Sequence, residues 1–251
     1  MVNANEKKNY FITIEYDGSN YHGWQRQKGV LTIQEVIESR LAIMTGENIT
    51  VWASGRTDAG VHALAQTAHF LSRTKIPPDA LWRGLNSLLP EDIVIKELKT
   101  VPRKFHARFH AKSKVYEYRV LNRPLRSALQ RNYIWHVPHE LKLEAMQEAL
   151  EILKGEHDFK AFQASGTKVK NTVRTLFRAE MAKKPGDVLI FTFEANGFLR
   201  YMVRNMVGTL IDLGKGKFSV DQIKEILESC DRQKAGMTAP ARGLYLVEVK
   251  Y

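Results

Sequence analysis

The stretch TIQEVIESRLAIMTGENITVWA, residues 32–53, decides the fold class of the first half of the chain. Thr32 and Glu35 form a capping-box pattern, apolar residues follow at helical spacing, and Gly46 supplies a helix stop. The β-branched run 49–53 comes directly afterwards and is typical of a strand. We therefore predict a helix followed by a strand, which indicates a mixed α and β fold.

The same pattern extends outward in both directions from this stretch. Further strands are predicted at 10–16, 67–71 and 93–98, and a second helix is predicted from Asp79 to about Ser87 after two prolines. The order recurs after the middle of the chain, with strands at 115–121, 175–182, 188–195 and 244–251 and helices at 141–153 and 198–213. A Ser219-x-x-Gln222 capping box predicts one short extra helix before the last strand.

These elements predict an α+β protein built from two similar β-α-β-β-α-β halves. Their sheets should be largely antiparallel and packed around a basic cleft. We expect an N-terminal half at residues 1–104 and a C-terminal half at residues 105–251.

Composition excludes several classes of protein. The 251 residues include 38 Lys and Arg against 27 Asp and Glu, for a net charge of +11. The single cysteine, Cys230, excludes an internal disulfide and a cysteine-based zinc site. The first residues are charged, and no apolar run approaches the ~18 residues of a membrane span, so we expect a cytoplasmic protein with no membrane contact.

Positive charge is concentrated between Lys99 and Arg131, where ten basic residues face only Glu117. A second basic segment runs from Lys160 to Lys184. Solvated charge alone could explain either segment, but aromatic residues lie among the first set of cations, a mixture that suits phosphate neutralisation and base stacking. RNA is therefore the predicted partner.

A metal site is the weaker interpretation of the histidines in this region. His106 and His110 have the spacing of two ligands on a helix, but the glutamate of the zincin pattern and an obvious third ligand are missing. We predict no metal.

The segment ASGRTDAGVHA, residues 53–63, places Arg56 and Asp58 in a loop bracketed by glycines after an apolar strand. An Asx-type turn, with Asp58 bonded to nearby amides, would explain an ordinary loop of this kind. A carboxylate in a chain that otherwise presents cations to an anion also suggests chemistry, because carboxylates act as nucleophiles or bases at sugar and base carbons.

These residues carry a resemblance to the bacterial tRNA pseudouridine synthase A family over essentially the whole length. The matching strings are IEYDG (14–18), GWQRQ (23–27), GRTDAGVHA (55–63), NSLLP (86–90), FHARF (105–109), YEY (116–118), GEHDF (155–159), MVRN (202–205) and GLYL (243–246). The resemblance implies the pseudouridine synthase fold and an isomerase that converts uridine to pseudouridine at positions 38, 39 and 40 of the tRNA anticodon stem-loop.

By the same resemblance Asp58 would be the catalytic carboxylate, and the enzyme would use no metal and no cofactor. The carboxylate could attack C6 of the base, attack C1′, or remove a sugar proton, and the sequence does not choose among these routes. The family also implies a homodimer.

Three further residues would bind the substrate. The residue matching Tyr116 stacks on the target base in the family, Arg204 would pair with Asp58, and Arg56 would enter the stem where the uridine has left it. The target uridine must be extruded, because C1′ and C6 are inaccessible inside a helix. A core role for Tyr116 and a structural ion pair for Arg204 are the alternatives.

Two other functions remain as alternatives. A non-catalytic RNA-binding protein with RNA-recognition-like α+β modules would leave the GRTDAG loop unexplained, and the aromatic pattern of those modules is missing. A nuclease or glycosidase would require a carboxylate pair or metal ligands near Asp58, where the sequence has Arg and His instead.

Overall fold

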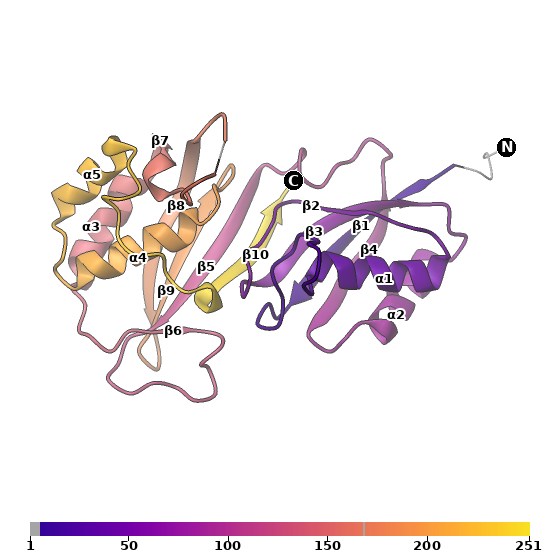
Figure 1. Cartoon of the computed structure of the whole chain (residues 1–251), viewed down its shortest axis with the longest axis horizontal. Helices are drawn as coiled ribbons and strands as arrows, with labels where there is room; N and C mark the ends of the chain where they lie inside the picture. The colour runs from indigo at the N-terminus through magenta and orange to yellow at the C-terminus, as the bar shows by residue number, and fades with distance from the viewer. Residues whose placement is uncertain (1–5, 168) are drawn as a thin grey trace. The chain divides into compact units, whose positions relative to one another are not determined.

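A computed structural model of the chain describes residues 6–167 and 169–251, which form two compact units (Figure 1). Unit 1 contains the described residues up to Lys112 together with Leu246–Tyr251, and unit 2 is Ser113–Tyr245. The boundary between the two units therefore lies between residues 112 and 113. The boundary between two halves at residues 104 and 105 stays a prediction. Within the described ranges, every helix is too short or too polar to span a bilayer.

Unit 1 follows the predicted β-α-β-β-α-β order. Its elements are β1 (Lys8–Tyr16), α1 (Ile33–Thr45), β2 (Val51–Ala53), β3 (His62–Ser72), α2 (Pro78–Leu88) and β4 (Ile93–Val101). Strand β1 lies between β3 and β4 and pairs antiparallel with both, while β2 pairs antiparallel with β3. The prediction of an α+β fold with largely antiparallel pairing is confirmed.

The sheet of unit 1 has two different faces because side chains alternate along a strand. On one face Tyr10 and Ile12 are fully buried, and Tyr10 stacks on Phe70 with ring centroids 5.2 Å apart. The inward residues of α1 and α2 are also fully buried, and the two helices contact each other (Figure 1). On the opposite face Phe11 lies beside His69, its register partner on β3.

The start of α1 corrects one prediction. Helix α1 begins after Thr32, as expected, but the Thr32 side chain makes no capping hydrogen bond, so the capping box at this end is wrong. Instead, the amides of Ile33 and Gln34 donate to the carbonyls of Gly23 and Trp24, at 3.2 and 3.0 Å. A tertiary contact therefore satisfies two of the free amides of the helix end. Gly46 ends the helix in the left-handed conformation, as predicted.

Unit 2 contains mostly antiparallel strands and three helices. Its elements are β5 (Ser113–Leu121), β6 (Trp135–His136), α3 (Leu143–Leu153), β7 (Gly155–Asp158), a 3₁₀ turn (Phe159–Phe162), β8 (Val173–Lys184), β9 (Val188–Ala195), α4 (Met202–Gly214), α5 (Val220–Ser229) and a 3₁₀ turn (Ala241–Gly243). The strand order is β5-β9-β8-β7, and β6 pairs parallel with β5. The last strand, β10 (Leu244–Lys250), begins in unit 2 and ends in unit 1.

The structure adds details that the sequence pattern did not predict in unit 2. The short strands β6 and β7 were not expected, because each is too short for a recognisable alternation. Helix α4 begins at Met202 rather than at residue 198, since Tyr201 has a φ of 65° and interrupts the helical path. The Ser219 to Gln222 capping box of α5 is confirmed.

Candidate functional site

The glycine-bracketed motif forms the connection between β2 and β3. Thr57 is buried, Asp58 is half-buried and Arg56 is exposed. The amide of Val61 donates to the main-chain carbonyl of Asp58 at 3.2 Å, which closes a tight turn just before β3. The loop therefore presents a basic and an acidic side chain two residues apart around a buried threonine.

Buried polar side chains hold the base of this loop. The Ser54 hydroxyl donates to Gln66 Oε1 at 2.8 Å, and Gln66 Nε2 donates to the Gly55 carbonyl at 3.0 Å. The Tyr16 hydroxyl lies 2.7 Å from Thr57 Oγ1, and burial raises the pKa of Tyr16 well above its usual range. This hydrogen bond therefore stays between two neutral hydroxyls at neutral pH.

The segment between β1 and α1 supports the loop from outside, and two glycines allow it to come close. A Cβ on Gly18 would overlap the carbonyl of Val61, and a Cβ on Gly23 would lie 2.5 Å from the carbonyl oxygen of Thr57. Gly23 also has a φ of +84°, which other residues rarely adopt. The Trp24 amide donates to the same Thr57 carbonyl at 3.0 Å.

Gly23 and Trp24 therefore contact two parts of unit 1 at once. Their carbonyls accept the first amides of α1, and they also touch the main chain at Thr57. The position of the Asp58 loop is thus coupled to the start of α1 by short, directional backbone contacts.

Tyr116 lies on β5 in unit 2, where it pairs with Phe193 of β9. Its side chain is buried, and its ring makes an edge contact with Phe198 at a centroid distance of 5.0 Å. Tyr118, on the same side of the strand, is fully buried, and its hydroxyl donates to the carbonyl of Pro240 at 2.6 Å. Tyr118 is therefore a core residue of unit 2.

Arg204 lies in the first turn of α4, where neighbouring groups orient its guanidinium. Its Nε donates to the carbonyl of Ala239 at 2.7 Å, and the Ala239 amide donates back to the Arg204 carbonyl at 3.0 Å. The guanidinium carbon lies 4.6 Å from the ring centroid of Tyr201. A planar cation held by a hydrogen bond and an aromatic face has few rotamers left.

The four predicted site residues fall in different units. Arg56 and Asp58 belong to the β2–β3 connection of unit 1, whereas Tyr116 and Arg204 belong to β5 and α4 of unit 2. The pairing of Asp58 with Arg204 and the substrate contacts of all four residues stay predictions.

Internal ion pairs occupy part of the basic stretch between Lys99 and Arg131. Lys99 pairs with Glu97 at 2.7 Å, and Arg103 pairs with Glu6. Arg119 pairs with Glu117 and lies 3.9 Å from the Tyr245 ring centroid. These cations have protein partners, so the sequence count overstates the charge available to a polyanion.

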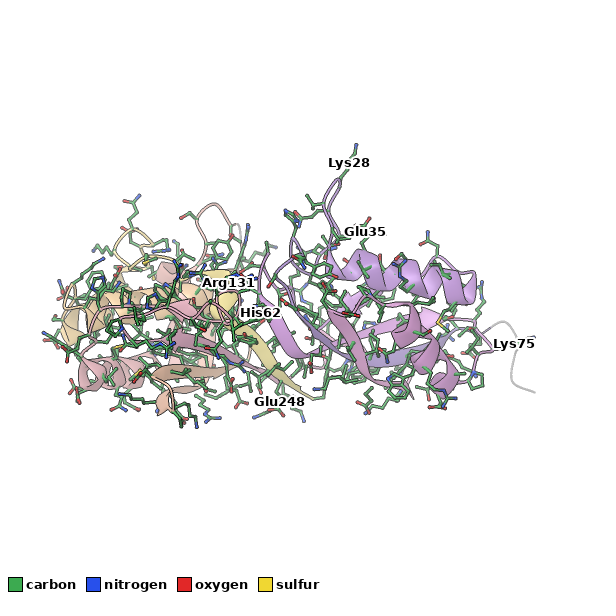
Figure 2. All side chains as sticks on the ribbon, turned by 90° about the horizontal axis from the view of Figure 1, so that it is seen from below. Lys28, Glu35, His62, Lys75, Arg131 and Glu248 are labelled. Atoms are coloured by element: carbon green, nitrogen blue, oxygen red, sulfur yellow. The ribbon has the colours of Figure 1, made fainter. Side chains whose placement is uncertain are left out.

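Other cations are presented to solvent in unit 1. Lys104, Arg108 and Lys112 are exposed near the end of β4. Lys28 projects from the tip of a small hairpin closed by a bridge between Gln27 and Val30 (Figure 2). Exposed cations of this kind suit phosphate contacts.

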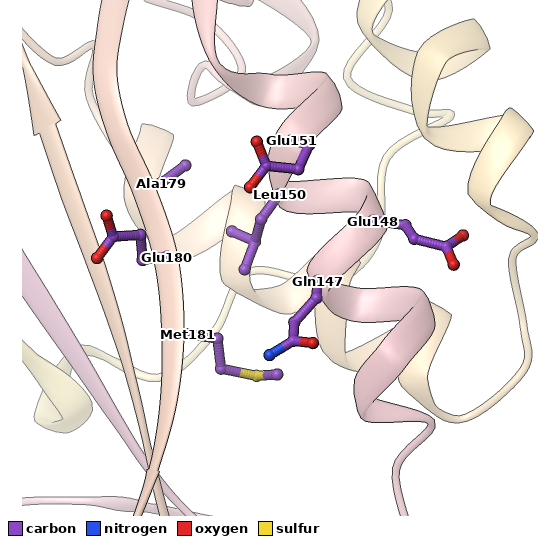
Figure 3. A pocket seen from close by; sticks show the side chains of 7 residues that line it. All are labelled: Gln147, Glu148, Leu150, Glu151, Ala179, Glu180 and Met181. Atoms are coloured by element: carbon purple, nitrogen blue, oxygen red, sulfur yellow. The ribbon is translucent and has the colours of Figure 1, made fainter.

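A pocket in unit 2 has three glutamates and no cation among its lining residues. Helix α3 and strand β8 line it, and the side chains of Glu148 and Glu180 point away from the space between these two elements (Figure 3). Its lining residues are Gln147, Glu148, Leu150, Glu151, Ala179, Glu180 and Met181. Two of these glutamates have cationic partners, since Glu151 pairs with Lys154 at 2.6 Å and Glu180 pairs with Arg178 at 2.8 Å.

In the part of the chain that the structure describes, no three His, Cys, Asp or Glu side chains converge as metal ligands. The Nδ1 atom of His106 accepts from the amide of Arg108 at 3.2 Å, and that of His110 accepts from the amide of His106 at 3.0 Å. The helical spacing of these histidines therefore belongs to a hydrogen-bonded turn.

Sequence reasoning missed the residues that support the site. Gly18 and Gly23 lie in strings used for the resemblance, but only the folded chain shows that both abut the Asp58 loop. The sequence pattern places Tyr201 inside the predicted helix 198–213 and does not indicate that its ring lies beside the Arg204 guanidinium. A tyrosine directly before the MVRN string was the available signal.

Comparison with known proteins identifies the class of protein. The sequence profile described as tRNA pseudouridine synthase matches residues 12–110 and 149–251, which include the Asp58 loop and α4. This chain therefore belongs to the tRNA pseudouridine synthase family, an α+β family of isomerases that act on uridine in tRNA.

Similar proteins narrow the assignment within the family. A protein of Thermoanaerobacter sp. (strain X514) is 48% identical over 244 residues, which cover 97% of this chain and 100% of that protein. A protein of Ruminiclostridium cellulolyticum is 50% identical over 240 residues, which cover 96% of this chain and 98% of that protein. A protein of Clostridium acetobutylicum is 46% identical over 244 residues, which cover 97% of this chain and 100% of that protein. All three are named tRNA pseudouridine synthase A. These matches do not favour a non-catalytic RNA-binding protein.

Proposed function

We propose that this protein isomerises uridine to pseudouridine at positions 38, 39 and 40 of the tRNA anticodon stem-loop, with Asp58 as the catalytic carboxylate. Family membership supports the broader statement, an isomerase acting on tRNA. The observation that carries the role of Asp58 is the loop itself, in which a half-buried carboxylate stands beside an exposed arginine on a rigid base.

The rigidity of the loop is the physical argument for Asp58. A group that attacks or deprotonates a carbon must be held close to the productive geometry before the reaction begins. The loop is fixed at Ser54, Gly55 and Thr57 by side-chain and main-chain hydrogen bonds, so the carboxylate starts from a defined backbone position.

The reaction is balanced without a co-reactant. The bond between C1′ and N1 breaks, C1′ is rejoined to C5 of the same ring, C5 loses a proton and N1 gains one. A single carboxylate can begin this sequence by attack on C6, by attack on C1′, or by removal of a sugar proton, and the proposal holds for all three routes.

Tyr116, Arg204 and Arg56 complete the proposal as substrate-binding residues. Tyr116 stacks on the extruded uracil, Arg204 pairs with the carboxylate of Asp58, and Arg56 occupies the space that the uridine leaves in the stem. The bracing of Arg204 by Ala239 supports its part, because a guanidinium of fixed orientation favours a bidentate contact with a carboxylate.

The decisive experiment uses the purified full chain and an unmodified tRNA transcript with no added cofactor. Carbodiimide labelling and primer extension should map pseudouridine to positions 38–40 of transcripts that carry uridine there. Transcripts with cytidine at these positions serve as the matched control. Pseudouridine at other positions, or none, would contradict the proposal.

Asp58→Asn tests the catalytic role. The variant keeps the size of the side chain and most hydrogen bonds but removes the charge, so it should fold, bind tRNA at least as tightly and form no pseudouridine. Asp187→Asn is the control, since Asp187 is exposed in a hairpin turn at a φ of 60° that asparagine also tolerates. Loss of folding in the first variant would instead support the Asx-turn interpretation.

Two finer properties belong to the same proposal. Resemblance to the family suggests a homodimer, which light scattering on the purified protein would test by its mass. A cytoplasmic location is proposed from the tRNA substrate, and fractionation of the cells that produce the protein would test it.

A further inference from the structure

Four aromatic rings form a column in unit 1 that catalysis at Asp58 does not explain. The ring of Trp52 stacks on His69 at a centroid distance of 5.2 Å. His69 lies 4.5 Å from His106, and His106 lies 4.3 Å from Phe109. The column runs from strands β2 and β3 into the turn at residues 105–110.

Strand register determines the positions of Trp52 and His69, the two rings of the column that belong to strands. Trp52 and His69 are direct register partners on β2 and β3, and His69 is also the partner of Phe11 on β1. These three side chains therefore share the sheet face opposite to Tyr10 and Phe70. The turn at residues 105–110 lies against this face, where Phe105 contacts Phe11 at a centroid distance of 5.6 Å.

The turn is anchored at both ends, so the upper rings are held in place. The side-chain amide of Asn9 donates to the Phe105 carbonyl at 2.9 Å. The Tyr251 hydroxyl donates to the carbonyl of Ala107, also at 2.9 Å, and the Lys112 amide donates to the Lys250 carbonyl at 2.7 Å. A ring held in this way loses little conformational entropy when a ligand binds it.

The imidazoles of the column are uncharged at neutral pH. The Nδ1 atoms of His69 and His106 each lie 3.2 Å from a backbone amide nitrogen that donates to them. Burial and the nearby His106 lower the pKa of His69 to about 4, and burial also lowers that of His106. Neutral imidazoles accept these amide protons, whereas imidazolium could not.

The outer end of the column is open to solvent. Phe109 is 76% exposed, although a large apolar side chain gains free energy from burial. The Arg108 guanidinium lies 6.0 Å from its ring centroid, and Lys104 and Lys112 are exposed on the same segment. An open aromatic face beside cations matches the base and the phosphate of one nucleotide.

We infer that Phe109 is a stacking platform for an unpaired base of the bound tRNA, other than the uridine that is isomerised, with Arg108 on the adjoining phosphate. This inference rests on the proposed function only for the identity of the ligand. Charge favours RNA over a protein partner, because the exposed charged groups at residues 104, 108 and 112 are all cations.

The test measures binding of an unmodified tRNA transcript to the full chain by fluorescence anisotropy at several salt concentrations. Phe109→Ala should raise Kd about fivefold to a hundredfold and leave the salt slope unchanged, because stacking involves no counterion release. Arg108→Gln should also raise Kd but reduce the slope by about one phosphate contact. Phe177→Ala is the control, since Phe177 is another exposed phenylalanine, on β8, and its loss should leave Kd unchanged.

Phe109→Trp gives a direct signal of stacking. This variant should bind tRNA like the wild type, and its indole emission should be quenched as tRNA saturates the protein. An unchanged Kd in Phe109→Ala, or unquenched emission in Phe109→Trp, would overturn the inference. A change of oligomeric mass in Phe109→Ala would overturn it in favour of a contact between copies of this chain.

Catalysis at the Asp58 loop is measured separately. Phe109→Ala should lower kcat/KM by about the factor by which it raises Kd, while Asp58→Asn should bind tRNA without turnover. Failure of the wild type to form pseudouridine would contradict the proposed function. The Kd values and the indole quenching of the Phe109 variants would still show whether Phe109 stacks on a base of the tRNA.

Discussion

Acid should destabilise unit 1 through His69, and the size of the effect follows from its environment. His69 is only 4% exposed, and desolvation together with the nearby His106, which would repel a second charge once protonated, lowers the pKa of His69 from 6.5 to about 4. The unfolded chain binds a proton at His69 below about pH 6.5, whereas the folded chain does so only near pH 4. The contribution of uncharged His69 to the free energy of unfolding is therefore present above pH 6.5 and is lost as the pH falls from 6.5 to about 4.

The pKa difference sets the magnitude of this loss. One pKa unit corresponds to about 1.4 kcal/mol, so the full effect is on the order of 3 kcal/mol, of which about 2 kcal/mol is lost by pH 5. A domain stability of roughly 5–15 kcal/mol makes such a change easy to measure.

Urea unfolding at pH 8, 6.5 and 5, followed by tryptophan fluorescence, is the assay. Trp52 stacks directly on His69, so its emission reports on this part of unit 1. His69→Gln is the comparison, because glutamine can accept a hydrogen bond from the Ala107 amide but does not titrate. Between pH 8 and pH 5 the wild type should lose about 2 kcal/mol more than this variant.

Two results would refute this reasoning. One is a stability difference between wild type and His69→Gln that does not depend on pH. The other is an NMR titration in which the His69 imidazole protonates near pH 6.5 in the folded protein. Either result would mean that the ring is solvated or paired with an acid in solution.

The remaining predictions concern the loop and the proposed substrate contacts. Gly23→Ala should destabilise the protein by about 1–2 kcal/mol or more and reduce turnover, since the added Cβ would press on Thr57. Gly46→Ala is the control, because its position is open at a φ of 69°, and it should lose only about 1 kcal/mol of stability and keep turnover. Urea unfolding measures the stabilities, and a pseudouridine assay measures turnover. Tyr116→Phe should lower turnover with little effect on Kd, and Tyr116→Ala should weaken tRNA binding as well, provided that circular dichroism shows both folded. Arg204→Lys should lower kcat, because an ammonium cannot reproduce the two parallel hydrogen bonds of a guanidinium oriented by the Ala239 carbonyl. Full activity of this variant would instead support a structural role for Arg204.

Local patterns in the sequence determined most elements of this fold. Residues 12–16 alternate because Ile12, Ile14 and Tyr16 are buried on one face of β1, and the apolar spacing of α1 ends at Gly46 because a left-handed cap favours glycine. The Ser219 capping box succeeds for the same reason, since its two partners are three residues apart. The string at 55–63 identified the candidate loop because its chemistry-bearing residues are also close in sequence.

Tertiary contacts decided what these patterns did not predict. Thr32 was expected to cap α1, but the Gly23 and Trp24 carbonyls occupy that position, and a strained Tyr201 delays the start of α4. These outcomes depend on groups that chain folding brings together, and local propensity carries no information about them.

The column under Phe109 shows the same limit most clearly. Its rings come from β2, β3 and the turn after β4, and they meet because strand register places Trp52 beside His69 and because Asn9 and Tyr251 hold the turn over them. The sequence by itself determined that aromatic and basic residues are interleaved here. Only the tertiary structure decided which ring faces solvent, because register and anchoring are long-range contacts that composition and periodicity do not encode.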